Sequence, residues 1–188
     1  MEVTRECKNY EEALLPDEQV QWTGKAENFP LLSTENKSWL LLRWICSGVM
    51  LAALTALYAA AVFCGVAKFN IFVELIVIVA CGYVSYLPIG DWSKIRKNVR
   101  YYVTNKRVIL AVGKSVYALN RSGIKTECKS ADGGAVHILF GSCVGMPGRK
   151  YRRATVLPEV DDADLSKNGF VFYNVKEGRA GLEKLLSV

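Results

Sequence analysis

The sequence predicts a membrane α-helical hairpin combined with an α+β domain that faces the cytoplasm. Two apolar stretches, residues 44–66 and 71–89, are separated only by Ala67-Lys68-Phe69-Asn70. A linker this short can form only a tight turn, so the second stretch must run back beside the first. After Trp92 the composition changes to short segments rich in Val, Ile, Tyr and Leu, with turn residues between them.

Both apolar stretches have the length and composition of membrane-spanning helices. The first contains no Asp, Glu, Lys, Arg or His, and at about 1.5 Å rise per residue it crosses the roughly 30 Å hydrocarbon layer. The second carries one carboxylate, Glu74, in its first turn, where it can reach headgroups or water. We therefore expect two transmembrane helices in a lipid bilayer.

Two other interpretations of the apolar stretches fit the sequence less well. A chain of 188 residues that is 51% hydrophobic can bury long helices in a soluble core, but such helices normally keep a polar stripe, which neither stretch has. A cleaved signal peptide begins with basic residues. Here the residues before the first stretch are acidic: Asp17, Glu18, Glu27 and Glu35.

Basic residues near the helix ends predict the orientation, because they are retained on the cytoplasmic side. Lys37 and Arg43 precede the first helix, and the connecting turn offers only Lys68. Four cations follow the second helix: Lys94, Arg96, Lys97 and Arg100. We expect both termini in the cytoplasm and the protein in the cell membrane, inner or plasma. The expected parts are a cytoplasmic N-terminal segment, the hairpin and a cytoplasmic domain, at residues 1–38, 39–90 and 91–188.

Small residues recur at every fourth position of the first helix, which permits close helix packing in lipid. Two partners for this stripe are open: the second helix, around Cys81 and Ser85, or another copy of the chain in a homo-oligomer. The stripe consists of Gly48, Ala52, Ala56, Ala60 and Cys64.

The cysteines indicate packing rather than chemistry. Those inside the helices behave as small apolar residues, and Cys7, Cys128 and Cys143 have no CxxC spacing and only one His to help them. We expect reduced thiols and neither a metal nor a cofactor. A disulfide between Cys128 and Cys143 is the alternative if the topology is inverted.

The soluble part predicts a β-meander and a closing helix. Strands are expected at residues 99–104, 107–112, 115–119, 134–141 and 170–173, with 124–128 as a further candidate. Before the hairpin, residues 11–15 predict a short helix and residues 19–22 a strand that could complete the sheet. At the C-terminus, Asn174 and Glu177 have the spacing of a capping box, and the expected helix buries Val175, Leu182, Leu185 and Leu186.

Several short motifs occur in a characteristic order around the hairpin: Leu15-Pro16-Asp17-Glu18, then Trp22-Thr23-Gly24-Lys25, and after the hairpin the segment from Tyr101 to Ile109, with Thr104-Asn105-Lys106-Arg107. In this order the chain resembles bacterial membrane proteins with a pleckstrin-homology-like (PH-like) domain. The resemblance implies a PH-like antiparallel bent sheet or partial barrel with a C-terminal helix, and it implies no catalytic role. Residues 142–169 depart from the compact form of that family.

No motif predicts an enzyme. Gly113-Lys114-Ser115 lacks the first glycine of a phosphate loop, because Val108 stands there. His137 alternates within a strand pattern, and Asp161-Asp162-Ala163-Asp164 lacks the spacing of a calcium loop. The formal net charge of +6 is shared with the residues that set the topology, and no nucleic-acid reading element accompanies it.

The basic run Arg149-Lys150-Tyr151-Arg152-Arg153 is the most suggestive charged feature. It predicts either a surface near anionic headgroups or a solvated loop balanced by the acidic residues that follow. We expect a non-enzymatic two-pass membrane protein whose domain binds lipid headgroups, peptides or partner membrane proteins. The alternative is an accessory subunit of a transporter or secretion assembly that packs through its transmembrane helices. The candidate contacts for headgroups or partners are Lys94, Arg96, Lys97, Arg100, Arg149, Lys150, Arg152 and Arg153.

Overall fold

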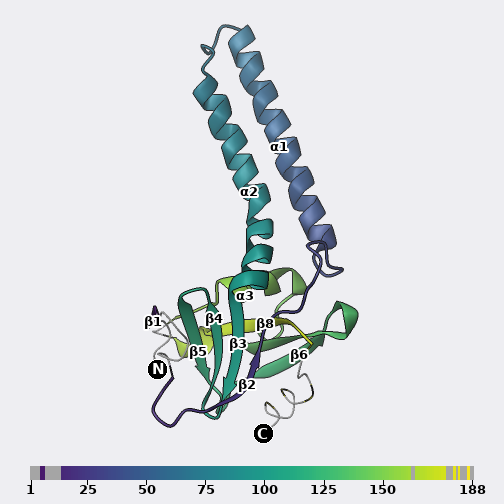
Figure 1. The fold of residues 1–188 in the computed structure, drawn as a ribbon. Helices are drawn as coiled ribbons and strands as arrows, with labels where there is room; N and C mark the ends of the chain where they lie inside the picture. The colour runs from purple at the N-terminus through teal and green to yellow at the C-terminus, as the bar shows by residue number, and fades with distance from the viewer. Residues whose placement is uncertain are drawn as a thin grey trace. The chain divides into compact units, whose positions relative to one another are not determined.

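The computed structural model describes residues 5–6, 14–161, 164–176, 180, 182 and 186. The chain forms two compact units, and each is described by itself (Figure 1). Residues 34–90 make a helical unit, and residues 1–33 together with 91–188 make a unit of antiparallel sheets with a short helix. The predicted combination of a helical hairpin with an α+β domain is present at this level.

The two long helices are α1 (Lys37–Phe63) and α2 (Ile71–Asn98). Helix α1 begins seven residues before the predicted start at residue 44, and α2 continues through Pro88 to Asn98, nine residues beyond the predicted end at 89. The predicted bounds followed hydropathy, which marks contact with lipid. Hydrogen bonding along the backbone does not stop where the apolar residues stop, so both helices continue into polar sequence.

In the described part of the chain, α1 and α2 are the helices long and apolar enough to cross a membrane. In the most apolar 18-residue window of each helix, only 6% of α1 and 11% of α2 is buried. A helix from a soluble core would be mostly covered by other elements. This exposure favours two membrane spans over the soluble-core alternative.

Side-chain hydrogen bonds join the two helices near the start of α1. The Ser47 hydroxyl donates to the Cys81 carbonyl at 3.0 Å and accepts from the Ser85 hydroxyl at 3.0 Å. One turn earlier, Trp44 Nε1 donates to the Ser85 carbonyl at 3.1 Å. Such polar contacts contribute to helix association in lipid, where hydrophobicity supplies no driving force between helices.

Further polar contacts lie toward the turn of the hairpin. The Thr55 hydroxyl donates to Glu74 Oε1 at 2.6 Å, so the one carboxylate of the second apolar stretch has a partner on the first helix. Near the turn, the Tyr58 hydroxyl accepts from the Asn70 N–H at 2.6 Å and donates to the Asn70 carbonyl at 3.1 Å. These contacts fix the helices against each other along most of their length.

The sheet unit contains two antiparallel sheets. The five-stranded sheet has the order β1 (Arg5–Glu6), β5 (Ser115–Asn120), β4 (Arg107–Val112), β3 (Val99–Thr104) and β2 (Val20–Gly24). The three-stranded sheet has the order β6 (Thr126–Ser130), β7 (Val136–Gly141) and β8 (Gly169–Val175). The predicted strands are therefore confirmed with small shifts, and the candidate strand at 124–128 is present two residues later as β6.

Strand β2 precedes the hairpin and pairs antiparallel with β3, which follows it (Figure 1). Thr23 lies opposite Tyr102, and Gly24 lies opposite Tyr101. The expectation that the N-terminal strand completes the sheet from across the hairpin is confirmed. Residues 11–13 of the expected N-terminal helix lie outside the described residues.

Residues 142–168 hold no strand among those described, apart from a bridge between Glu159 and Gly169. They form the 3₁₀ turn η3 (Gly148–Lys150), helix α3 (Tyr151–Val156) and the 3₁₀ turn η4 (Leu165–Lys167). The basic run therefore lies mostly on a short helix rather than in a flexible loop. Strand β7 begins at Val136, two residues later than predicted, because the 3₁₀ turn η2 (Asp132–Gly134) precedes it. Gly133 and Gly134 have φ of 74° and 78°, which a strand does not allow.

The C-terminal helix is described only at residues 180, 182 and 186, all of them helical. Leu182 has no exposed surface and belongs to the main core, and Leu186 packs against it. The expected capping by Asn174 is wrong, because Asn174 and Val175 lie in β8, whose pairing with β7 extends to Val136 opposite Val175. Glu177 and Leu185 lie outside the described residues.

Alternating side chains of the five-stranded sheet divide between two apolar clusters. Tyr101, Val103 and Leu110 face the main core, which also takes in the buried residues of β7 and β8. Tyr102 and Ile109 belong to a smaller cluster, against which Leu14 packs. Because strand side chains alternate between faces, the five-stranded sheet is covered on both sides.

Tyr101 connects the two sheets through its hydroxyl group. The hydroxyl accepts from the Tyr173 N–H at 3.0 Å and donates to the Tyr173 carbonyl at 3.1 Å. Its ring stacks on Phe172 with the ring centroids 4.5 Å apart. Burial raises the pKa of Tyr101 above its ordinary value, so the hydroxyl keeps the proton that it donates.

Replacing Tyr101 with Phe should lower the free energy of unfolding by about 1 to 3 kcal/mol, because the Tyr173 N–H and carbonyl lose their shared partner in a buried place. Urea unfolding of the full chain in mild detergent, followed by near-UV circular dichroism, measures the change. Tyr117→Phe is the matched control, since its hydroxyl bonds to nothing in the described part of the chain. Equal effects of the two substitutions would contradict the role given to Tyr101.

Candidate functional site

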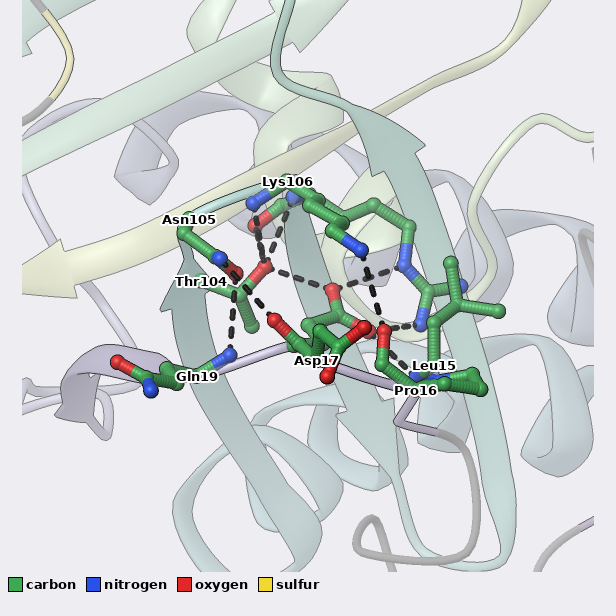
Figure 2. Close-up of polar contacts among 9 residues, drawn as sticks. Leu15, Pro16, Asp17, Gln19, Thr104, Asn105 and Lys106 are labelled. Carbon is green, nitrogen blue, oxygen red and sulfur yellow. Dashed lines mark hydrogen bonds and ion pairs between the residues drawn. The ribbon is translucent and has the colours of Figure 1, made fainter.

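Two of the motifs that carry the family resemblance, residues 15–18 and 104–107, meet at the turn between β3 and β4 (Figure 2). Thr104 organises this turn. Its hydroxyl oxygen accepts from the N–H groups of Lys106 at 3.2 Å and Arg107 at 2.8 Å. The same hydroxyl donates to Glu18 Oε1 at 2.7 Å, so one side chain both closes the turn and contacts the segment before β2.

Glu18 and Arg107 form a buried ion pair. Arg107 Nε donates to Glu18 Oε1 at 3.0 Å, and Arg107 Nη2 bonds the other carboxylate oxygen. The Glu18 side chain is 0% exposed and that of Arg107 14% exposed. The Leu15 N–H adds a further hydrogen bond to Glu18 Oε2 at 2.8 Å. Bidentate pairing of this kind fixes geometry as well as charge.

Asn105 and Lys106 extend the contact to the backbone of the N-terminal segment (Figure 2). Asn105 Oδ1 accepts from the Gln19 N–H at 3.0 Å, and the Asn105 N–H donates to the Gln19 carbonyl at 3.1 Å. Lys106 Nζ donates to the Pro16 carbonyl at 3.1 Å. The residue with a left-handed backbone here is Asp17, with φ 63°, and not Asn105. Asn105 serves to hold the neighbouring segment.

The environment of Glu18 determines its protonation. Burial by itself raises the pKa of the carboxyl, but hydrogen bonds from Arg107, Leu15 and Thr104 outweigh it and lower the pKa from 4.5 to about 2. The carboxylate is therefore ionised at any physiological pH. Its donors all come from the protein, so the network joins segments of the chain and has a structural role.

The basic residues at the end of α2 and at the start of β3 are exposed. Lys94 and Lys97 belong to α2, and Arg100 belongs to β3. Arg96 is exposed as well, lies 4.6 Å from the centre of the Trp92 ring and donates to Asn28 Oδ1 at 3.1 Å. Four exposed cations therefore lie within one stretch of chain.

Arg152 lies inside the domain and is not a surface contact. It is 5% exposed, and its Nη2 donates to Ser33 Oγ at 3.0 Å and to the Pro30 carbonyl at 3.2 Å. Its guanidinium lies 5.3 Å from the Phe29 ring centre and 5.9 Å from that of Tyr173. The sequence did not predict this placement, because a run of charged residues is usually solvated. Here α3 turns Arg152 toward the core.

The other members of the basic run stay at the surface. Arg149 and Lys150 are exposed in the turn before α3. Arg153 is 57% exposed and pairs with Asp91 at 3.6 Å. Arg149, Lys150 and Arg153 therefore lie on the exposed surface, and Arg152 does not.

The small-residue stripe of α1 does not pack against α2. Gly48, Ala52, Ala56, Ala60 and Cys64 are all exposed, and a Cβ on Gly48 would meet nothing within 4 Å. The contacts with α2 come from residues such as Ser47 and Thr55, one position earlier in each turn. In a helix with 3.6 residues per turn, successive residues are about 100° apart around the axis, so the stripe lies on a different face from Ser47 and Thr55. Polar side chains, rather than small ones, select the face that meets the partner helix.

His137 and the cysteines have structural surroundings. His137 lies in β7 as predicted, is buried, and its Nδ1 accepts from the Asn174 N–H at 2.9 Å. No disulfide joins Cys128 and Cys143, so the alternative pairing is not formed. Among the residues described, no group of three or more His, Cys, Asp or Glu is placed to hold a metal ion.

Comparison with known proteins finds no protein-family model, no curated protein and no solved structure that matches this chain.

Replacing Glu18 with Gln should lower the free energy of unfolding at pH 7 by about 3 kcal/mol, because Arg107 then lacks its buried partner charge. The pKa of Glu18 is lower in the folded state, at about 2, than its ordinary value of 4.5. The difference from the unchanged protein should therefore be complete above pH 4.5 and disappear as the pH falls through about 2. Urea unfolding of the full chain in mild detergent at several pH values measures it.

Glu127→Gln is the matched control for this prediction, because the Glu127 side chain is 34% exposed in its pair with Lys129. Exposed pairs contribute little to stability, because water and salt screen them. If Glu18→Gln cost no more than Glu127→Gln, the ion pair with Arg107 would not have the structural role described.

Proposed function

We propose that this chain is a two-pass protein of the inner or plasma membrane, with both termini in the cytoplasm, whose PH-like domain binds anionic lipid headgroups without catalysing a reaction. The exposed cations at the end of α2 form the contact. The order of motifs around the hairpin, which resembles that of PH-like membrane proteins, supports the type of domain. The exposure of the two apolar helices supports the membrane setting.

The place of the cations in the chain is the observation that carries the proposal. Helix α2 includes Pro88 and ends at Asn98. Lys94 and Lys97 follow Ile89 by only five and eight residues. The headgroup layer adds about 5 to 8 Å to each side of the hydrocarbon, and long basic side chains can reach back toward it. The short chain between the apolar part of α2 and these cations therefore keeps them close to the headgroup layer.

Electrostatics favours anionic over zwitterionic lipid. Each Lys or Arg close to an anionic leaflet contributes about 1 kcal/mol, and the effect fades within a Debye length of about 8 to 10 Å. Lys94, Arg96, Lys97 and Arg100 are four cations within seven residues of sequence. Arg149 and Lys150 are further exposed cations of the same domain.

Contacts with the rest of the domain hold the last turns of α2 in place. Trp92 Nε1 donates to the Phe29 carbonyl at 3.0 Å, and Arg96 donates to Asn28. Ile95, between the cations, is 1% exposed and belongs to the main core. Because the helix is fixed on its buried side, the backbone that carries the exposed cations loses little conformational freedom on binding.

Replacing both Lys94 and Lys97 with Glu should reduce the binding of phosphatidylglycerol at least tenfold, because two attractive charges become repulsive. Native mass spectrometry of the full chain in uncharged detergent, titrated with phosphatidylglycerol or phosphatidylcholine, counts the bound lipids. The full chain is needed, because a fragment that begins at residue 91 lacks β2 and Glu18. Arg152 and Arg153 are left unchanged, since they already have partners within the domain.

The control is Lys125→Glu, compared with Lys94→Glu alone so that the change of charge is the same. Lys125 lies beyond the end of β5 that is opposite to the end near Asn98. A six-residue strand separates the two ends by roughly 20 Å. Equal loss of phosphatidylglycerol in these two single variants, or no preference over phosphatidylcholine, would contradict the proposal.

A second candidate function is favoured by the exposed stripe of α1. The alternative of an accessory subunit in a transporter or secretion assembly needs a helix face that the hairpin itself does not use. Gly48, Ala52 and Ala56 lie on such a face. Small residues allow the close helix approach by which helices associate in lipid.

Replacing Ala52 and Ala56 with Leu should remove any larger membrane assembly, or a homo-oligomer, that copurifies with the full chain in mild detergent, because the added side chains separate the helix backbones. Mass measurement of the purified complex gives the result. Ala80→Leu, an exposed position of α2, is the control. An assembly of unchanged mass after the double substitution would argue against this interface.

A further inference from the structure

The turn of the hairpin, residues 64–70 between α1 and α2, is fixed in place and surrounded by apolar side chains. The Tyr58 hydroxyl bonds both the N–H and the carbonyl group of Asn70, and Asn70 Oδ1 accepts from the Phe72 N–H at 3.0 Å. The large apolar side chains around the turn are exposed: Phe63, Val66, Phe69, Ile71 and Phe72. An exposed apolar surface of this size lies against lipid or against another protein.

Two opposite charges are set into this apolar surface. Lys68 is the one charged residue of the turn, and Glu74 is the one charged residue of the second apolar stretch. Glu74 is half-buried, and its Oε1 accepts from the Thr55 hydroxyl at 2.6 Å. Thr55 stands at the middle of the first apolar stretch, residues 44–66, and about 12 Å along the axis from the end of α1 at Phe63. The bond to Thr55 therefore holds the carboxylate among apolar residues.

Neither charge is compensated within one chain. In the described part of the chain, Glu74 Oε2 and Lys68 Nζ have no hydrogen-bond or ionic partner, and the two side chains do not pair with each other. The Thr55 hydroxyl is neutral and leaves the charge of Glu74 in place. Charged side chains at membrane depth pair with one another or with backbone carbonyls. Two uncompensated charges of opposite sign therefore indicate a neighbour that carries both complements.

A second copy of the chain carries both complements at the same level. In a symmetric dimer one surface meets its own copy, so each contact occurs twice. Lys68 of one copy then faces Glu74 of the other, and Glu74 of the first faces Lys68 of the second. No other cation of a second copy is available here, because residues 44–66 and 71–89 contain no Lys, Arg or His.

We propose that the turn end of the hairpin is a homodimer interface, in which Lys68 of each copy pairs with Glu74 of the other. The exposed apolar side chains around the turn exclude water from these ion pairs and strengthen them. The inference rests on the membrane setting proposed above, and it depends neither on headgroup binding by Lys94 and Lys97 nor on the small-residue stripe of α1.

Charge reversal tests the proposal. Native mass spectrometry of the full chain in uncharged detergent measures the dimer, which we expect for the unchanged protein. Glu74→Lys and Lys68→Glu each place like charges together, so each should raise the dissociation constant of the dimer at least tenfold. The double variant restores opposite charges and should restore the dimer. An unchanged protein that is monomeric, or a double variant as dissociated as the single variants, would overturn the proposal.

Glu74→Gln separates the ion pair from the hydrogen bond to Thr55. The amide oxygen still accepts from the Thr55 hydroxyl, but the charge is gone, so the dissociation constant should again rise at least tenfold. Lys37→Glu, at the exposed start of α1, is the control and should leave the dimer unchanged. Equal dimer content in the Glu74→Gln variant and the unchanged protein would overturn the ion pair. Because the same spectra count bound phosphatidylglycerol, loss of the dimer and loss of headgroup binding are measured separately.

Discussion

A buried ion pair between Glu18 and Arg107 holds together the two parts of the domain that the chain supplies on either side of the hairpin. The two residues are 89 positions apart in sequence. Removing one partner of a buried pair costs about 3 to 5 kcal/mol of stability. The free energy of unfolding of a protein domain is roughly 5 to 15 kcal/mol, so loss of this contact would remove a large part of it. The pairing of β2 with β3 depends on the same junction, because Val20 lies opposite Thr104 beside the ion pair.

The two chain segments that connect the domain with the hairpin are held by neighbouring residues of α3. Arg152 bonds the incoming segment at Pro30 and Ser33, and Arg153 pairs with Asp91 at the outgoing one. A guanidinium is well suited to the buried position, since it donates in several directions and stacks on aromatic rings. Arg152 and Arg153 thus serve to fix these connections.

The sequence alone was sufficient to predict the elements that a local pattern of residues defines. Alternation and turn residues predicted β3, β4 and β5 nearly to the residue, and the polarity pattern predicted the hairpin. Features set by contacts between distant segments were not predictable. The burial of Arg152 depends on Ser33 and Pro30, and the face that α1 presents to α2 depends on Ser47 meeting Cys81 and Ser85.

The insertion of a hairpin between β2 and β3 has a consequence for when the domain can form. Loop closure becomes more costly as the loop lengthens, although slowly. Here the intervening residues are folded into two helices joined by side-chain hydrogen bonds, one of which, between Trp44 and Ser85, lies close to both ends of the hairpin. The formed hairpin therefore brings the segments after β2 and before β3 together and removes most of that cost. Pairing of β2 with β3 is thus easier in a chain whose hairpin has already formed.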